Sequence, residues 1–276
     1  MTAPIVSVSD LRIRFPTQDR RETVKAVDGV SFDVMPGETF GIIGESGSGK
    51  STLAMAICGL LPQAARVTGA ITFPALGRPI LGRDIGVVFQ DPAGSLNPVL
   101  TIGEQIAEVA VIHRGLSWRD GRAHAARLLD RMEIPRPAEA LRRHPHEFSG
   151  GQRQRIALAA ALAADPVLLI ADEPTSALDT IVQHQIVELL DSLVRERGLT
   201  LLFVTHDIAL ASMLADEVAI LHGGQLMETG PVARVFRTPA HAYTRALLAA
   251  RLDLDTPLQH RLPEIGPDFT VVTPHG

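Results

Sequence analysis

The residues best suited to chemistry lie between positions 44 and 51, where the sequence reads Gly-Glu-Ser-Gly-Ser-Gly-Lys-Ser. A short apolar run, Phe40–Ile43, precedes this stretch, and a helical pattern, Thr52–Leu60, follows it. A glycine-rich loop between a strand and a helix turns main-chain N–H groups toward an anion, and the helix N-terminus adds partial positive charge. A glycine-rich turn that binds nothing is disfavoured, because all four fixed positions and both flanks fit the pattern. The stretch therefore predicts a nucleotide-binding loop.

Two residues of this loop have distinct expected roles. The Lys50 ammonium reaches the β- and γ-phosphates, and the Ser51 hydroxyl takes a coordination place on Mg²⁺. The glycines let the main chain approach the phosphates. The predicted nucleotide contacts are Gly44, Glu45, Ser46, Gly47, Ser48, Gly49, Lys50, Ser51 and Thr52.

A second group of chemical residues follows the apolar run Val167–Ala171, which ends in two carboxylates, Asp172 and Glu173. A buried strand delivers its C-terminal residues to the ligand edge of an open α/β sheet. There Asp172 holds Mg²⁺, directly or through water, and Glu173 accepts a proton from, or orients, the water that attacks the γ-phosphate. The alternative is that both carboxylates cap the next helix, and the phosphate loop upstream makes this alternative weaker.

Ser149-Gly150-Gly151-Gln152 stands at the start of a predicted helix that runs to Ala164. Ser149 and Gln152 fit a capping box, so the simplest interpretation is a well-capped helix. A cap alone does not need the two glycines. They clear side chains from the helix N-terminus and expose N–H donors to an anion.

Composition narrows the class of protein. The chain has 276 residues, of which 46% are hydrophobic and 21% charged, and its net charge is -5. An acidic balance argues against nucleic-acid partners, which usually need a basic surface. The single cysteine, Cys58, permits no internal disulfide. The N-terminus has no signal-peptide pattern, and the longest apolar run, Ile156–Ala164, is too short to span a membrane. We therefore expect a soluble protein whose membrane role depends on a partner.

The elements that must position these motifs alternate between strand and helix, which predicts an α/β fold with a mainly parallel core sheet. Two strand-like stretches, Ile5–Phe15 and Val24–Val34, predict an antiparallel β subdomain at the N-terminus, and Ile71–Phe73 is a candidate third strand. Residues 91–98 carry turn residues, and 102–141 read as helices inserted into the core. We expect an ATPase domain over residues 1–250, with the helical insertion at about 91–165, and a tail over 251–276.

Phe148–Arg155 closely resembles the signature of ATP-binding cassette (ABC) proteins. The other motifs follow in the order typical of that family, over roughly residues 5 to 250. Residues 44–51 resemble its Walker A, Gln90 its Q-loop, and Asp172-Glu173 its Walker B, while Ser176–Asp179 resembles its D-loop and His206 its switch histidine. The resemblance implies a P-loop NTPase cassette that binds ATP and Mg²⁺ and hydrolyses ATP.

The resemblance also implies a head-to-tail dimer of two cassettes, in which the Walker A of one and the signature of the other enclose ATP. By this resemblance, the residues that contact the ATP bound to the partner cassette are Ser149, Gly150, Gly151, Gln152 and Asp179. Gln90 then contacts the metal or the attacking water and reports to the membrane subunits. His206 contacts the γ-phosphate and positions Glu173, whereas without the family pattern it reads as a strand-end histidine bonded to Asp207. Phe15 is the candidate for stacking on the base, and its alternation with Leu11 and Ile13 equally fits a core role.

Further stretches resemble the peptide and nickel importers within this family: Phe89–Pro98, Pro239–Leu248 and Arg261–Ile265. This implies an ATPase subunit at the cytoplasmic face of a bacterial inner or plasma membrane, with two permease subunits, a second cassette in a homo- or heterodimer, and indirectly a solute-binding protein. Di- or oligopeptides are the first expected solute, and nickel or a metal chelate is the alternative. A soluble ABC ATPase acting on nucleic acid or ribosomes is less favoured. The tail has no cysteine, so we expect no iron–sulfur cluster.

Overall fold

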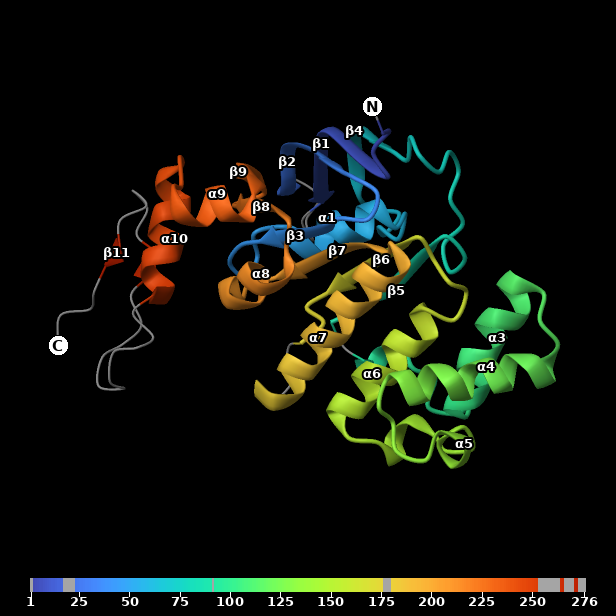
Figure 1. Cartoon of the computed structure of the whole chain (residues 1–276). Helices are drawn as coiled ribbons and strands as arrows, with labels where there is room; N and C mark the ends of the chain where they lie inside the picture. Colours follow the sequence, from blue (N-terminus) through green and yellow to red (C-terminus); the bar gives the residue numbers. More distant parts are fainter. Residues whose placement is uncertain are drawn as a thin grey trace.

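The structure is a computed structural model that describes residues 2–16, 23–90, 92–175, 180–252, 264–265 and 271–272. Within these ranges the chain forms a larger sheet, a smaller antiparallel sheet and a block of helices (Figure 1). None of the described helices has the length and apolar content needed to cross a membrane.

The larger sheet has the strand order β5-β6-β7-β3-β8-β9. Five strands run parallel, and β9 pairs antiparallel with β8. Their bounds are β3 Thr39–Ile43, β5 Ile85–Val88, β6 Leu168–Asp172, β7 Thr200–Thr205, β8 Glu217–His222 and β9 Gln225–Pro231. The strands β3, β6 and β7 are buried along their whole length, which explains why they read as continuous apolar runs. The predicted α/β fold with a mainly parallel core is confirmed.

The smaller sheet has β1 (Val6–Pro16) between β2 (Thr23–Val34) and β4 (Arg66–Thr72), with both pairs antiparallel. The predicted N-terminal antiparallel start is confirmed, and of the predicted third strand only residues 71 and 72 belong to β4. Alternation along β1 is interrupted near Asp10, whose φ of +40° accompanies a shift in register. This bulge keeps the later apolar residues of β1 on the buried face.

A helical block stands to one side of the larger sheet (Figure 1). Its members are α2 (Pro92–Ser95), α3 (Ile102–Arg114), α4 (Trp118–Arg131), α5 (Pro137–Ala140), the 3₁₀ turn η1 (Pro145–Glu147) and α6 (Gly150–Ala161). The prediction that residues 91–98 consist only of turns is wrong, because α2 forms there. A proline in the first turn of a helix loses no intrahelical hydrogen bond, so the Pro92 that suggested a turn equally starts a helix.

The remaining helices are α1 (Lys50–Ile57), α7 (Thr180–Arg197), α8 (Ile208–Leu214), α9 (Val232–Arg237) and α10 (Ala242–Leu252), and a short pair, β10 (Glu264–Ile265) and β11 (Val271–Val272), follows them. Two apolar clusters fill the two faces of the larger sheet. One joins it to the helical block and α7, and the other joins it to the smaller sheet and α1. The carboxyl ends of β3, β5, β6 and β7 are therefore held in position by a packed core on both faces of the sheet.

Candidate functional site

The loop between β3 and α1 is packed so closely that two of its glycines have no room for a side chain. A Cβ on Gly44 would lie 2.2 Å from the Leu221 carbonyl oxygen, and one on Gly49 would lie 2.2 Å from the Ala26 carbonyl oxygen. Gly49 also has a φ of +96° and forms the N-cap of α1. The glycines therefore allow the loop to pack directly against the main chain of β8 and β2. In this arrangement the N–H groups of the loop lie at the N-terminus of α1.

This packing predicts unequal costs for two alanine substitutions. Gly49→Ala combines a left-handed conformation with a clash against main chain, so we expect it to lower the free energy of unfolding by about 3 kcal/mol. Gly47→Ala is the matched control. Its φ is +80°, but no atom lies within 4 Å of the added Cβ, so a loss of only about 1 kcal/mol is expected. Urea unfolding of both variants measures the difference, and equal losses would contradict the packing argument.

Lys50 and Ser51, the first residues of α1, have partners in and beyond the loop. Lys50 is only 5% exposed, and its Nζ donates to the Glu45 carbonyl oxygen at 2.7 Å. Burial lowers the pKa of Lys50, while the charges of Glu173, Asp172 and Glu45 oppose that shift. The Ser51 hydroxyl donates to Asp172 Oδ1 at 3.1 Å. The helix start thus joins the end of β6, 121 residues away.

The two carboxylates at the end of β6 have different surroundings. Burial raises the pKa of Asp172 and the charge of Glu173 raises it further, against the hydrogen bond from Ser51 and the charge of Lys50. Glu173 has a φ of +47°, a left-handed conformation that is uncommon for a residue other than glycine. Its main-chain N–H donates to the Val204 carbonyl oxygen at 2.9 Å. Backbone conformations of this kind concentrate at functional sites.

The Glu173 carboxylate lies between two side chains from neighbouring strands. Gln90 Nε2 donates to Glu173 Oε2 at 2.8 Å, and His206 Nδ1 lies 3.1 Å from Glu173 Oε1. These residues follow β5, β6 and β7, whose parallel pairing brings their carboxyl ends to the same edge of the sheet. Asp207, the alternative partner of His206, instead accepts hydrogen bonds from two N–H groups at the start of α8. The structure therefore brings Gln90, Glu173 and His206 together.

The signature residues lie elsewhere, at the start of α6 in the helical block (Figure 1). The predicted capping box is confirmed: Ser149 Oγ accepts from the Gln152 N–H at 3.3 Å, and Gln152 Oε1 accepts from the Ser149 N–H at 3.1 Å. Gly150 is exposed, and a Cβ there would meet no atom within 4 Å. The helix start is thus open to solvent at Gly150, while Gly151 is partly buried, and it is separate from α1 (Figure 1).

Two further predicted site residues are not placed at this edge. Phe15, near the end of β1, is half-buried and packs against the apolar cluster between the two sheets. This contact fits the core role that its alternation allowed, and its stacking role stays a prediction. Asp179 lies outside the described residues.

Sequence reasoning missed the support beneath the phosphate loop. The turn between β8 and β9 touches it, because the Gly224 N–H donates to the Ser48 carbonyl oxygen at 3.1 Å. The Gly224 carbonyl oxygen in turn accepts from the Asp28 N–H at 2.8 Å. The sequence His222-Gly223-Gly224 indicates a hairpin turn, but its spacing carries no signal that this turn lies against residues 44–49.

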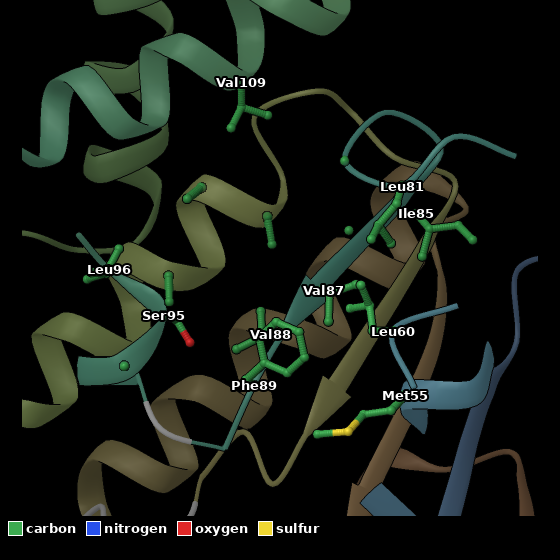
Figure 2. A pocket seen from close by; sticks show the side chains of 16 residues that line it. Met55, Leu60, Leu81, Ile85, Val87, Val88, Phe89, Ser95, Leu96 and Val109 are labelled. Carbon is green, nitrogen blue, oxygen red and sulfur yellow. The ribbon is translucent and has the colours of Figure 1, made fainter. Parts of the chain in front are cut away.

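An apolar groove of about 670 Å³ lies beside β5, next to the segment that leads to Gln90. Figure 2 shows Met55 and Leu60 on one side of β5, with Leu96 and Val109 of the helical block on the other. Its lining is dominated by apolar side chains from both parts of the molecule. The groove therefore borders both the segment that leads to Gln90 and the helical block.

Comparison with known families agrees with this geometry. Residues 27–176 match the family model described as ABC transporter. The chain belongs to the ABC transporter family. Residues 227–273 of this cassette also match the model described as oligopeptide/dipeptide transporter, C-terminal region. The predicted resemblance to the peptide-importer branch is thereby confirmed.

Individual relatives and solved structures give the same result. The cassette is 45% identical to a putative peptide import ATP-binding protein of Brucella abortus over 274 residues, which are 96% of this chain and 82% of that protein. It is 42% identical to the dipeptide transport ATP-binding protein DppD of Bacillus subtilis, covering 95% of this chain and 82% of that one. Among solved structures, it is similar to the dimeric post-hydrolysis state of the ATP-binding cassette MJ0796 bound to ADP and Pi. The TM-score is 0.72 and the sequence identity 30%, and the match covers 82% of this chain and 98% of that one.

Proposed function

We propose that this chain is the ATP-hydrolysing subunit of a membrane importer that takes up di- or oligopeptides through partner permease subunits. The observation that carries the proposal is the convergence of Gln90, Glu173 and His206 beside the Lys50–Ser51 helix start. The match of residues 227–273 and the peptide transport named for the relatives favour peptides over nickel as the solute.

The loop has the chemistry needed for a nucleotide. Residues 44–52 offer main-chain N–H groups to the phosphates, and a phosphate oxygen takes the place of the Glu45 carbonyl as acceptor for the Lys50 ammonium. The Ser51 hydroxyl and the Asp172 carboxylate are adjacent oxygen donors of the kind Mg²⁺ prefers. These two residues, with Gln90, are the proposed metal site. A bound Mg²⁺ neutralises charge on the phosphate oxygens.

Glu173 is the proposed catalytic carboxylate. Its two oxygens are held from opposite sides by Gln90 and His206, so the carboxylate has one defined orientation. In that orientation it orients the attacking water and accepts its proton. His206, whose side chain is half exposed at the same edge, contacts the γ-phosphate. Hydrolysis then gives ADP and phosphate.

The exposed signature supports pairing with a second cassette. The start of α6 presents N–H donors to solvent with open space above Gly150, and the chain's own phosphate loop lies on a different part of the molecule. We place the partner's ATP against Ser149, Gly150, Gly151 and Gln152, with Asp179 acting across the same interface. Phe15 stacks on the base of the chain's own nucleotide.

The groove beside β5 is the proposed contact with the permease subunits. It is apolar and adjoins the segment before Gln90, so a segment seated there displaces water and touches the chain leading to the catalytic edge. The cassette is then a peripheral subunit at the cytoplasmic face of the membrane, and a solute-binding protein delivers the peptide on the far side.

The importer assignment predicts which proteins accompany the chain. We expect a tagged chain, recovered from native membranes with Mg-ATP, to carry multispanning permease chains that mass spectrometry identifies. Leu60→Arg should abolish their recovery and leave the basal ATPase rate unchanged, because Leu60 lines the groove and is 43% exposed. Met213→Arg, at a 57% exposed position of α8 outside the groove, is the matched control and should retain them.

Two outcomes would overturn the assignment. Recovery of nucleic-acid or ribosomal proteins in place of permeases would contradict transport altogether. If permeases are recovered but the accompanying solute-binding protein binds nickel and no dipeptide, the peptide assignment is wrong.

A further inference from the structure

The start of α10, in the C-terminal region of the chain, reaches the phosphate loop. Tyr243 is completely buried, and its ring centroid lies 4.2 Å from that of His222. His222 Nδ1 in turn lies 3.8 Å from a carboxylate oxygen of Glu45. A helix almost 200 residues downstream therefore meets the second residue of the loop.

The Tyr243 hydroxyl lies beside Glu45. Burial and the charge of Glu45 raise the pKa of Tyr243 to about 12, and hydrogen bonding from the Glu45 main chain opposes this shift. The same residue, Glu45, supplies the carbonyl that accepts from Lys50 at 2.7 Å. Tyr243 thus borders the stretch of main chain that sets the position of the Lys50 ammonium.

The hairpin between β8 and β9 provides a second link to the loop. Its Gly224 donates to the Ser48 carbonyl oxygen, and Leu221 leaves no room for a side chain at Gly44. The hairpin therefore contacts the loop at Gly44 and at Ser48. Tyr243 packs on His222, one of the two residues between these contacts. Any shift of Tyr243 is transmitted to the loop through packed atoms.

Tyr243 is itself held in place by a buried carboxylate. Glu228 of β9 accepts from the N–H groups of Ala240 at 3.0 Å and His241 at 3.1 Å. Burial opposes ionisation of Glu228, yet these hydrogen bonds and the charge of Arg234 lower its pKa overall. The ionised carboxylate fixes the start of α10 on the sheet, and with it the direction of Tyr243.

From these contacts we propose that Tyr243 is a positioning residue for the phosphate loop. With His222 it holds the Glu45 main chain so that Lys50 and the loop N–H groups face the nucleotide. The inference rests on the proposed nucleotide-binding role of residues 44–52. It gives the C-terminal region of this cassette a direct part in nucleotide affinity.

The test is steady-state ATP hydrolysis and direct ATP titration of the full chain carrying Tyr243→Phe. This change keeps the ring against His222 and removes only the hydroxyl beside Glu45. We expect the KM and the Kd for ATP to rise about fivefold, with kcat within about twofold of wild type, because the polar hydroxyl beside the Glu45 main chain is lost while the ring stays in place. A second variant, His222→Phe, keeps a ring against Tyr243 and removes the nitrogen that faces Glu45. We expect it to raise KM about twofold.

Thr244→Val is the matched control. Thr244 is also completely buried and stands next to Tyr243, but its hydroxyl faces Glu228. A residue that only supports the core changes melting temperature without changing KM, so Thr244→Val should lower the melting temperature and leave KM as in wild type. If Tyr243→Phe and His222→Phe behave like Thr244→Val, the positioning role is overturned.

Lys50→Ala, measured in parallel, separates this inference from the proposed function. If Lys50→Ala binds ATP as tightly as wild type, the nucleotide site itself is wrongly assigned. If Lys50→Ala loses ATP while Tyr243→Phe keeps wild-type affinity, only the role of Tyr243 fails.

Discussion

Glu173→Gln should reduce ATP hydrolysis by about 100- to 10,000-fold while ATP remains bound, because general-base catalysis is lost and the side chain keeps its shape. The amide retains an oxygen to accept from Gln90 and leaves His206 in contact range, so the geometry at the ends of β5, β6 and β7 persists. Its affinity for a proton is far lower than that of the carboxylate, so the attacking water keeps its proton. The bound ATP should then stabilise the paired cassettes.

Rapid-quench single-turnover kinetics together with an ATP titration measure the two effects separately. Glu188→Gln is the matched control, because it makes the same chemical change on the exposed face of α7 and should leave both quantities unchanged. A single-turnover rate equal to that of wild type would show that another group takes the proton. Weaker ATP binding with an unchanged rate at saturating ATP would show that Glu173 contributes to nucleotide binding and not to catalysis.

Lys50→Ala should weaken ATP binding by about 10- to 100-fold and abolish measurable turnover, since a charge-assisted contact to the phosphates is worth about 1.5–3 kcal/mol. Lys50 is buried at the start of α1, and its ammonium donates a hydrogen bond to the Glu45 carbonyl oxygen. Burial disfavours the charged form of Lys50, and a negatively charged phosphate beside it favours that form again. The attraction between phosphate and ammonium therefore offsets the free-energy cost of burying the charge. Alanine leaves only the main-chain N–H groups of the loop.

Isothermal titration calorimetry with ATP and Mg²⁺ measures this loss. Lys25→Ala is the matched control, because it removes an ammonium from the exposed part of β2 near Asp28 and should leave the Kd unchanged. Equal affinities for Lys50→Ala and Lys25→Ala would mean that the loop does not bind the phosphates through its lysine.

The sequence alone determined the chemistry at each strand end and the class of fold. The pattern at residues 44–51 includes a glycine that local backbone geometry requires, because Gly49 has a left-handed conformation at the start of α1. The need for glycine at position 44 comes from the neighbouring Leu221 carbonyl, so it depends on tertiary packing. The apolar runs before Gly44 and Asp172 are continuous because their strands, β3 and β6, are buried on both faces. Local patterns predict structure less well where one residue type is common in two kinds of element. Proline is common both in turns and in the first turn of a helix, so the stretch after Asp91 was predicted as a turn although α2 begins there.

Only the tertiary structure decided which strand ends meet. Gln90 and Glu173 are 83 residues apart, and their hydrogen bond depends on β5 lying beside β6 in the sheet. No local pattern encodes strand order, because it follows from how whole elements pack on one another. The same reason hid the position of Tyr243. Its motif was visible in the sequence, but its contact with Glu45 exists only because β8 and β9 extend the sheet beside β3 and carry α10 back to the phosphate loop.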